Sequence, residues 1–508
     1  MTIHLNHAAL LVIGTGIMGT GIAQVAAQSG HPVFLFDSRD GAAGKAKAKL
    51  AETFDTLVAK GKLDAESAKL ILARIAPVAT LEAARSARLA VEAIVENLQA
   101  KRALFQQLEA ILDEGAILAT NTSSISVTAI ANGLNHPGRL VGMHFFNPVP
   151  LMKLVEVISG LQTLPETAEA IFTLSQAWGK VPVHARSTPG FIVNRIARPY
   201  YAEALALLQE QAASPQALDT CMRAAGFRMG PCELMDLIGH DTNFAVTQSV
   251  YEANFYDKRF VPSLVQRELV DGGLLGRKSS QGFYRYPAGM PAWIPSPVEE
   301  PDWASRIVIH GTGPIADHLA NELAVKFAQA PERDVTSPWT GLAVDDARLV
   351  LSDGRSATEL ATVLNVPDVA VFDRFNIGHA HAGALALAYS TAQCVSPRWK
   401  AQAQAWLVTL GFTPVELADV PGLIVTRTLA MLINEAADAI VQGVCSPEGA
   451  DAAMKLGVNY PQGPFEWLQT WGARDVVGIL DALDTQYRGE RYRASPWLRR
   501  RIALEKNQ

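Results

Sequence analysis

The sequence predicts an α/β domain followed by a helical domain, with a degenerate copy of this pair in the second half of the chain. Three observations predict this arrangement. A short apolar run turns into a glycine-rich loop at residues 10–19, a helical pattern replaces the α/β alternation from Thr188 onward, and three motifs of the first half recur in the same order in the second half.

The first element is the glycine-rich loop. Residues 10–13 predict a buried strand, residues 14–19 fit G-x-G-x-x-G, residues 20–29 predict a helix, and a second apolar run over 32–36 ends at Asp37. Gly14 permits a tight turn, Gly16 lets a pyrophosphate approach the backbone, and Gly19 lets the helix pack closely on the strand. The phosphates would lie at the helix N-terminus. This order of elements predicts a Rossmann-like dinucleotide-binding domain.

The acidic residue after the second strand indicates which dinucleotide would bind. Asp37 would accept hydrogen bonds from the adenosine ribose, and its charge would repel a 2′-phosphate, so NAD is favoured over NADP. Arg39 lies two residues further on and could pair with that phosphate, which leaves NADP as the alternative.

Length and composition limit the class of protein. A chain of 508 residues is too long for one core and predicts three or four domains. The formal net charge of −6 gives no reason to expect a nucleic-acid partner. The four cysteines lack metal-binding spacing and predict reduced thiols. No apolar run reaches the roughly 20 residues of a membrane span, and the first residues resemble no targeting segment, so we expect a cytoplasmic protein with no membrane partner.

The rest of the first half continues the α/β pattern and then becomes helical. Residues 40–62 predict a lysine-rich helix, and 89–94, 116–120, 139–144 and 153–158 predict buried parallel strands. Helices are expected over 191–211 and over 214–225, the second with Ser214 as N-cap and Pro215 at its first position. Five prolines then mark a linker. The expected domains are 1–187 (dinucleotide-binding), 188–286 (helical), 287–302 (linker), 303–418 (degenerate Rossmann-like) and 419–508 (second helical).

The duplication is inferred from three pairs of motifs. Residues 306–316 repeat the strand and glycine-rich loop, residues 420–427 (VPGLIVTR) repeat residues 188–195 (TPGFIVNR), and residues 463–467 (GPFEW) repeat residues 230–234 (GPCEL). Because the three pairs keep their order and nearly the same offset, we infer a fused duplication.

Polar side chains lie where predicted strands end. They are the cluster Asn121-Thr122-Ser123-Ser124, the segment His144-Phe145-Phe146-Asn147-Pro148, and Glu156 on the following strand. Ligands of open α/β sheets bind at the carboxyl ends of the strands. An imidazole titrates near neutrality and can accept a proton, and a buried carboxylate could orient it. Two alternatives stay open at this point: the histidine is a core residue, and the serines only cap the next helix.

The same segments resemble the L-3-hydroxyacyl-CoA dehydrogenase family. The matching segments are 12–19, 91–97, 121–124, 142–156 and 188–195, and the resemblance covers about residues 8–286. In its fused length the chain is similar to bacterial 3-hydroxybutyryl- and 3-hydroxyadipyl-CoA dehydrogenases of aromatic degradation. The resemblance implies an all-α C-terminal dehydrogenase domain and the reversible, NAD-dependent oxidation of a (3S)-3-hydroxyacyl-CoA to a 3-oxoacyl-CoA.

The resemblance also implies residue roles. His144 would be the general base with Glu156 orienting it, and Ser123 and Asn194 would hydrogen-bond the reacting oxygens. CoA would contact Lys60 and Thr53, the latter standing where the family has a serine. The residues expected around NAD are Gly14, Gly16, Ile17, Met18, Gly19, Asp37, Glu96, Lys101, Ser123, Asn147 and Lys278.

The second half departs from this pattern. Thr426 replaces Asn194, residues 373–378 lack a histidine at the base position, an apolar run over 382–388 replaces the strand of Glu156, and Ala316 replaces the third glycine. His379 and His381 could suggest a metal, but no further ligand residues join them, so no metal is expected. We therefore expect the second half to lack catalysis.

Two other functions and one partner arrangement complete the expectations. A hydroxyisobutyrate- or 6-phosphogluconate-type dehydrogenase shares the G-x-G-x-M-G opening but relies on a lysine, and an NAD-binding regulatory protein would have lost turnover.

Single-copy family members pair through their helical domains. The two helical domains of this chain are therefore expected to pair with each other, and a higher homo-oligomer stays open.

Overall fold

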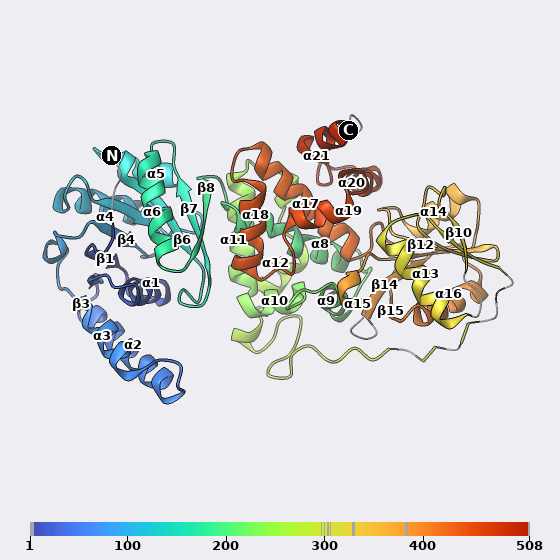
Figure 1. Ribbon diagram of the computed structural model, residues 1–508, viewed down its shortest axis with the longest axis horizontal. Helices are drawn as coiled ribbons and strands as arrows, with labels where there is room; N and C mark the ends of the chain where they lie inside the picture. Colours follow the sequence, from blue (N-terminus) through green and yellow to red (C-terminus); the bar gives the residue numbers. More distant parts are fainter. Residues whose placement is uncertain are drawn as a thin grey trace. The chain divides into compact units, whose positions relative to one another are not determined.

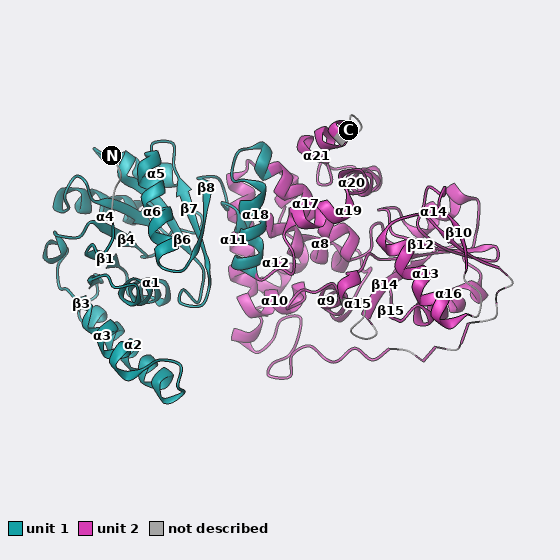
Figure 2. Ribbon diagram, viewed as in Figure 1, with its two compact units in different colours: residues 1–195, 439–458 teal, residues 196–438, 459–508 magenta. Residues whose placement is uncertain are grey.

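The computed structural model describes residues 5–505 except 296, 299, 302–303, 305, 328–330 and 381–384. The chain forms two compact units, described separately here. The first contains Met1–Arg195 and Ala439–Val458, and the second contains Ile196–Asp438 and Asn459–Gln508 (Figure 2). Among the described residues, no helix combines the length and apolar character needed to cross a membrane.

The first unit is built on an eight-stranded sheet with the order β3-β2-β1-β4-β5-β6-β7-β8. Neighbouring strands from β3 to β6 are parallel, which is the arrangement of a Rossmann-like domain and confirms this part of the predicted fold. The strands are β1 (Leu10–Ile13), β2 (Val33–Phe36), β3 (Ile75–Pro77), β4 (Leu89–Glu92), β5 (Ile117–Thr120), β6 (Leu140–Phe145), β7 (Leu154–Ser159) and β8 (Val181–Arg186).

Local sequence explains where the helices of this unit begin. Asn97 caps α4 by accepting a hydrogen bond from the Ala100 amide, and Asp64 caps α3 in the same way through Ser67. Helices α2 and α3 lie side by side and project from the β3 edge of the sheet (Figure 1). The helices are α1 (Ile17–Gln28), α2 (Ala42–Ala59), α3 (Ala65–Ala73), α4 (Leu98–Ile111), α5 (Val127–Ala131) and α6 (Pro165–Ala177).

Strand β7 corrects the expectation of a parallel strand over residues 153–158. It runs antiparallel to β6, with His144 opposite Glu156. Only eight residues separate the two strands, whereas a parallel connection needs a crossover of about a dozen or more residues. The short connection therefore forces the antiparallel pairing.

A segment from the second half completes the first unit. Helix α18 (Pro447–Val458) packs on β7 and β8, and the Arg186 amide donates to the Val444 carbonyl at 2.9 Å. A Cβ on Gly457 would lie 2.7 Å from Leu154 Cδ2, so the glycine permits this close approach.

The second unit begins with helices of the first half. The helix predicted over 191–211 is divided into α7 (Val193–Ile196) and α8 (Arg198–Gln209). Pro199 lies at the start of α8 and cannot donate an amide proton to a continuous helix. The next helix begins at Pro215 with Ser214 as its N-cap, as predicted. The helices after α8 are α9 (Pro215–Ala224), α10 (Pro231–Ile238), α11 (His240–Ala253) and α12 (Leu264–Asp271).

A second sheet has seven strands in the order β10-β9-β11-β12-β13-β14-β15. Strand β11 is antiparallel to β9, whereas the first sheet has the parallel strand β4 beside β1, so the copy is incomplete. Its strands are β9 (Ile307–His310), β10 (Glu332–Asp334), β11 (Gly341–Val344), β12 (Ala347–Leu351), β13 (Val369–Phe372), β14 (Leu385–Thr391) and β15 (Phe412–Glu416). Its helices are α13 (Pro314–Lys326), α14 (Ala357–Leu364), α15 (Ile377–Ala380) and α16 (Pro397–Thr409).

The remaining helices contact those of the first half through buried ion pairs. Arg427 Nε lies 3.0 Å from Glu203 Oε2, and both side chains are fully buried. Arg491 pairs with the other oxygen of Glu203 at 2.8 Å, and Arg259 pairs with Glu435 at 3.1 Å. These contacts join α8 and the segment before α12 to α17 (Val425–Val441) and the C-terminal region, which includes α19 (Pro464–Trp471), α20 (Ala473–Tyr487) and α21 (Pro496–Glu505).

Replacing Arg427 by Met should therefore destabilise the protein. The change leaves Glu203 buried with only Arg491 as a cationic partner, and breaking a buried pair in this way costs about 3 kcal/mol. Urea unfolding should show this loss in the free energy of unfolding. Arg499→Met is the control, because the Arg499–Asp481 pair is about half exposed and should change stability by less than about 1 kcal/mol. Equal stability of the two variants would contradict the role of the buried network.

Candidate functional site

A histidine–carboxylate pair lies at the end of strands β6 and β7. His144 Nδ1 is 2.6 Å from Glu156 Oε2, and the two residues are 6% and 0% exposed. If Nδ1 carries the proton toward the carboxylate, the other ring nitrogen keeps its lone pair and can accept a proton. The rings of Phe146 and Phe191 lie 4.6 and 5.9 Å from the imidazole ring. The geometry therefore fits a general base oriented by a carboxylate.

Glu156 has a second set of partners. Its Oε1 accepts hydrogen bonds from the backbone amides of Ile192 at 3.1 Å and Val193 at 2.9 Å. These amides open α7, where Asn194 is half-buried in the next position. One carboxylate thus fixes both the histidine ring and the turn that carries Asn194.

The serine-containing loop after β5 is held by a single carboxylate. Glu96 Oε1 accepts hydrogen bonds from Thr122 Oγ1 at 2.6 Å, Ser123 N at 2.9 Å and Ser124 N at 3.1 Å. Burial raises the pKa of Glu96, but the charge of Lys101 and the hydrogen bonds from Thr122 and Ser123 outweigh it, so the pKa lies below its usual value. Glu96 therefore orders the loop that presents Ser123.

Lys101 lies beneath this loop and is only 1% exposed. Its ammonium is 2.6 Å from Glu92 Oε1 and 3.2 Å from Glu96 Oε2. Glu92 is fully buried and also accepts a hydrogen bond from Thr120 Oγ1 at 2.7 Å. The sequence prediction placed Lys101 beside the cofactor; the structure surrounds its ammonium with two carboxylates, so it can act on the site through Glu96.

The glycine-rich loop has the geometry expected for phosphate binding. Gly14 has φ of 99°, and a Cβ there would lie 2.4 Å from the Ala93 carbonyl oxygen. A Cβ on Gly19 would lie 1.9 Å from the Gly14 oxygen, whereas Gly16 has open space around its Cβ position. Gly16 is the N-cap of α1 and makes no side-chain cap, which leaves first-turn amides to meet an anion. Ile17, 76% exposed, and the neighbouring Met18 lie in this first turn.

Asp37 lies at the end of β2 and contacts the same loop. Its Oδ2 accepts hydrogen bonds from the Thr15 amide at 2.9 Å and Thr15 Oγ1 at 2.6 Å. Arg39, which is 74% exposed, donates to both carboxylate oxygens at 3.0 and 3.1 Å. The hydrogen bond from Arg39 holds the pKa of Asp37 well below its usual range, despite partial burial. The carboxylate is therefore ionised and its charge is partly balanced by Arg39.

The remaining residues predicted to contact CoA or NAD lie in separate parts of the structure. Thr53 and Lys60 are exposed on and just after α2, seven residues apart and so on one helix face. Asn147 is exposed just beyond β6. Lys278 belongs to the second unit, where it pairs with Asp241.

Sequence reasoning missed three groups near this site. No sequence pattern assigned Glu92 to the site, because it is a single acidic residue in an apolar strand. Gln442 Oε1 accepts a hydrogen bond from Arg195 NH1 at 2.7 Å, and Cys445, whose pKa burial and the nearby Glu156 charge raise to about 12, lies in the same loop. Both come from the second half, so local motifs of the first half could not reveal them.

In the second half, Asp373 stands at the position that the motif comparison assigns to His144. Asp373 Oδ2 accepts from the amides of Ile424 at 2.9 Å and Val425 at 2.6 Å, and Oδ1 accepts from Thr426 Oγ1 at 2.6 Å. Its backbone pairs with Ala388. The carboxylate of Asp373 thus holds a turn that is equivalent to the one held by Glu156 in the first half. No imidazole is present at this position. Of the predicted histidine pair, His379 lies in α15 and His381 lies outside the described residues. Among the residues described, no metal-binding cluster occurs.

Comparisons with known proteins agree with this geometry. The model of the 3-hydroxyacyl-CoA dehydrogenase NAD binding domain matches residues 9–188, and that of the C-terminal domain matches residues 190–286 and 422–508. The 3-hydroxybutyryl-CoA dehydrogenase reduced Rossmann-fold domain matches residues 349–421. These matches support a duplication of the helical domain and a reduced second Rossmann-like domain.

Individual relatives include proteins of full and of half length. The chain is 43% identical over 504 residues to 3-hydroxyadipyl-CoA dehydrogenase of Escherichia coli, covering 99% of this chain and 98% of the relative. It is 44% identical over 276 residues to a probable 3-hydroxybutyryl-CoA dehydrogenase of Deinococcus radiodurans, covering 54% and 99%. A crystal structure of E. coli 3-hydroxybutyryl-CoA dehydrogenase matches with a TM-score of 0.89 and 41% identity over 99% of this chain and all of that chain. The chain therefore belongs to the NAD-dependent 3-hydroxyacyl-CoA dehydrogenase family.

Proposed function

We propose that the site of the first unit oxidises a (3S)-3-hydroxyacyl-CoA reversibly to the 3-oxoacyl-CoA with His144 as the general base. The observation that carries this proposal is the 2.6 Å contact between His144 Nδ1 and the buried Glu156. The second ring nitrogen accepts the C3 hydroxyl proton, and the carboxylate stabilises the resulting imidazolium. NAD, when bound, supplies the acceptor for the C3 hydride.

We assign Ser123 and Asn194 to the oxygen on C3. Each follows a backbone segment held by a carboxylate: Glu96 fixes the Ser123 loop, and Glu156 fixes the turn before Asn194. Donors that are positioned in advance stabilise the charge that develops on an oxygen without reorganising during the reaction. Glu96 and Lys101 are then positioning residues for this loop.

The residues around the glycine-rich loop fit NAD. Gly14, Gly16 and Gly19 leave room for a pyrophosphate at the α1 N-terminus, and ionised Asp37 suits the ribose hydroxyls. Because Arg39 is already paired with Asp37, it is poorly placed to take a 2′-phosphate. Asn147 and Lys278 complete the proposed cofactor contacts.

We propose that CoA binds along α2, where Thr53 and Lys60 share an exposed face with further lysines. Lys47 is not one of the proposed CoA contacts, because its ammonium already donates a hydrogen bond to the Ile75 carbonyl at 2.6 Å. The long relatives are named for 3-hydroxyadipyl- and 3-hydroxybutyryl-CoA, so the corresponding 3-oxoacyl thioesters are the first substrates to compare. NADH consumption with acetoacetyl-CoA and 3-oxoadipyl-CoA tests the reaction.

We further propose that the second half is a structural partner without turnover. Its helices bury ion pairs with those of the first half, and Asp373 occupies the position of the base. The chain would then bind NAD at one site, and its two helical domains would pair as an internal pseudo-dimer. We also propose that the protein acts in the cytoplasm. Two equivalent NAD sites in calorimetry would contradict this arrangement.

Replacing His144 by Gln should lower kcat by about two to four orders of magnitude, because the chain loses its positioned base. The dissociation constant of NADH should change little, since the glycine-rich loop is untouched. Glu156→Gln should also lower kcat and shift the pH profile, because the imidazolium loses its counter-charge. Retention of more than about a tenth of kcat in His144→Gln would contradict the assignment.

Replacing Asp37 by Ala should weaken NADH binding by about tenfold and narrow the preference over NADPH, because the ribose acceptor is lost and Arg39 is released. Binding of both nucleotides should be measured by fluorescence titration. Asp64→Ala is the control, since Asp64 only caps α3. Equal affinity of the unmodified protein for NADH and NADPH would contradict the role of Asp37.

Replacing Gln442 by Leu should lower kcat by about tenfold through the loss of its hydrogen bond to Arg195, the neighbour of Asn194. NADH affinity should stay unchanged, and Gln442→Glu should restore most of the rate because it keeps the acceptor. Gln469→Leu is an exposed control in the second half. An unchanged kcat in Gln442→Leu would show that this contact with the second half does not position the site.

A further inference from the structure

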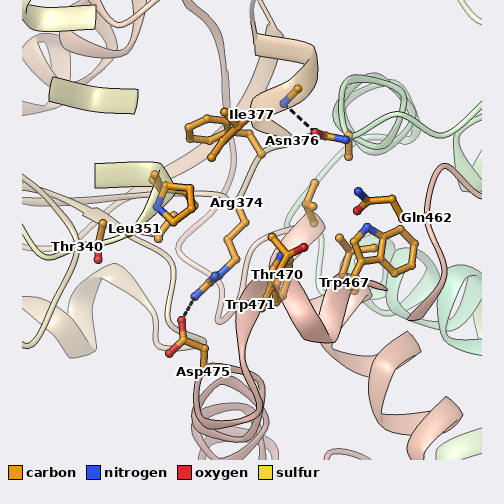
Figure 3. A pocket seen from close by; sticks show the side chains of 18 of the residues that line it. Thr340, Leu351, Arg374, Asn376, Ile377, Gln462, Trp467, Thr470, Trp471 and Asp475 are labelled. Atoms are coloured by element: carbon orange, nitrogen blue, oxygen red, sulfur yellow. Dashed lines mark hydrogen bonds and ion pairs between the residues drawn. The ribbon is translucent and has the colours of Figure 1, made fainter. Parts of the chain in front are cut away.

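The second unit contains a cavity of about 510 Å³ at the carboxyl ends of β9, β12 and β13. Its lining includes the turn before α13, the segment after β13, and one face of α19 with the start of α20 (Figure 3). A volume of this size lies in the range of small-molecule sites, and this edge of an α/β sheet is where ligands bind. The lining of the cavity includes Thr312, Ile315, Arg374, Trp467, Trp471 and Asp475.

The cavity corresponds by motif to the catalytic region of the first half. Thr312–Ile315 align with Thr15–Met18 of the glycine-rich loop, and Arg374 aligns with Phe145. The catalytic groups are replaced: Asp373 stands at the position of His144, and both of its oxygens are occupied by the turn before α17. A proton acceptor of the kind used in the first half is therefore missing from this position.

The features that would recognise adenosine are also replaced. Gly311 N bonds to Asp334 O as Gly14 N bonds to Phe36 O, which places Val335 at the position of Asp37. Val335 offers no acceptor for a ribose. Trp339 stacks on His310 at 4.1 Å just beyond the end of β9. These replacements disfavour a dinucleotide.

The cavity lining of the second half contains a cationic side chain, that of Arg374. Arg374 is 9% exposed, and among the described residues its buried Nε has no hydrogen-bond acceptor. Its NH2 lies 3.0 Å from Asp475 Oδ2, and its guanidinium lies 4.6 Å from the centre of the Trp471 ring. Asp475 is 53% exposed, so its charge is screened by water while the arginine is buried. A largely buried guanidinium whose carboxylate partner is exposed to water favours a further anion that reaches it from the cavity.

The surroundings of Arg374 add positive potential and flat apolar walls. Helix α13 begins at the cavity with Gly313 as N-cap and no side-chain cap, so its N-terminal amides favour an anion. Trp467 and Trp471 present aromatic surface, and Ile315 and Phe375 add apolar contact. Figure 3 shows Arg374 near Trp471, with its guanidinium directed toward Asp475.

We propose that this cavity is a non-catalytic binding site for a small organic carboxylate with a flat apolar body. The carboxylate pairs with the guanidinium of Arg374 near the N-terminus of α13, and the apolar body lies against the tryptophans. This site is separate from the proposed oxidation in the first unit and does not depend on it.

The test measures binding to the full-length protein by calorimetry, with benzoate as the probe and benzamide as its neutral counterpart. Benzoate should bind at least about tenfold more tightly than benzamide, and Arg374→Met should weaken benzoate binding by about tenfold or more. Arg474→Met is the matched control, because Arg474 is exposed at the start of α20, next to Asp475, and is not in the lining of this cavity. It should change the affinity less than about twofold.

A second variant keeps the test decisive if Arg374→Met does not fold. Thr470 is an exposed residue of the cavity lining, and Thr470→Trp should obstruct the cavity and weaken benzoate binding without loss of NADH affinity in the first unit. Three outcomes would overturn the proposal: no benzoate binding up to about 10 mM, equal binding of benzamide, or tighter binding of AMP than of benzoate.

Discussion

The carboxylate of Glu156 is the constraint on which the rest of the site depends. One oxygen contacts His144 and the other accepts the amides of Ile192 and Val193. Because Glu156 is fully buried, each of these partners compensates the charge of its carboxylate. Losing either partner would leave a poorly compensated charge in the core, which is energetically unfavourable. The proposed base and the turn bearing Asn194 are thereby fixed relative to each other by a single side chain, which gives the positional accuracy that proton transfer requires.

The second half has a different carboxylate at the corresponding turn. Asp373 reaches the amides of Ile424 and Val425 directly from the strand equivalent to that of His144. The shorter side chain replaces both members of the pair: the turn keeps its carboxylate, and the imidazole is gone. A carboxylate at this turn is therefore compatible with the fold whether or not an imidazole stands beside it.

The sequence was sufficient for the fold of the first domain and for its central pair. The glycine-rich loop, Asp37 and the spacing of His144 and Glu156 could be interpreted because each depends on local patterns. The antiparallel direction of β7 was missed, since a short, continuously buried run of residues does not reveal strand direction. The short connection from β6 did contain that information. The contact of Gln442 with Arg195 could not be predicted, because it joins residues 247 positions apart through a fold-level duplication.

Lys101 lies at the centre of an ion-pair network beneath the serine-containing loop. Its ammonium joins Glu92, buried under the loop, to Glu96, which holds the serine-containing loop. A buried lysine between two carboxylates leaves one net negative charge, and the amides of Ser123 and Ser124 and the hydroxyl of Thr122 distribute part of it. The loop is thus held by charge-assisted hydrogen bonds, which are stronger than neutral ones. Ser123 can then be presented in one geometry before either substrate arrives, while the cost of ordering the loop is met during folding.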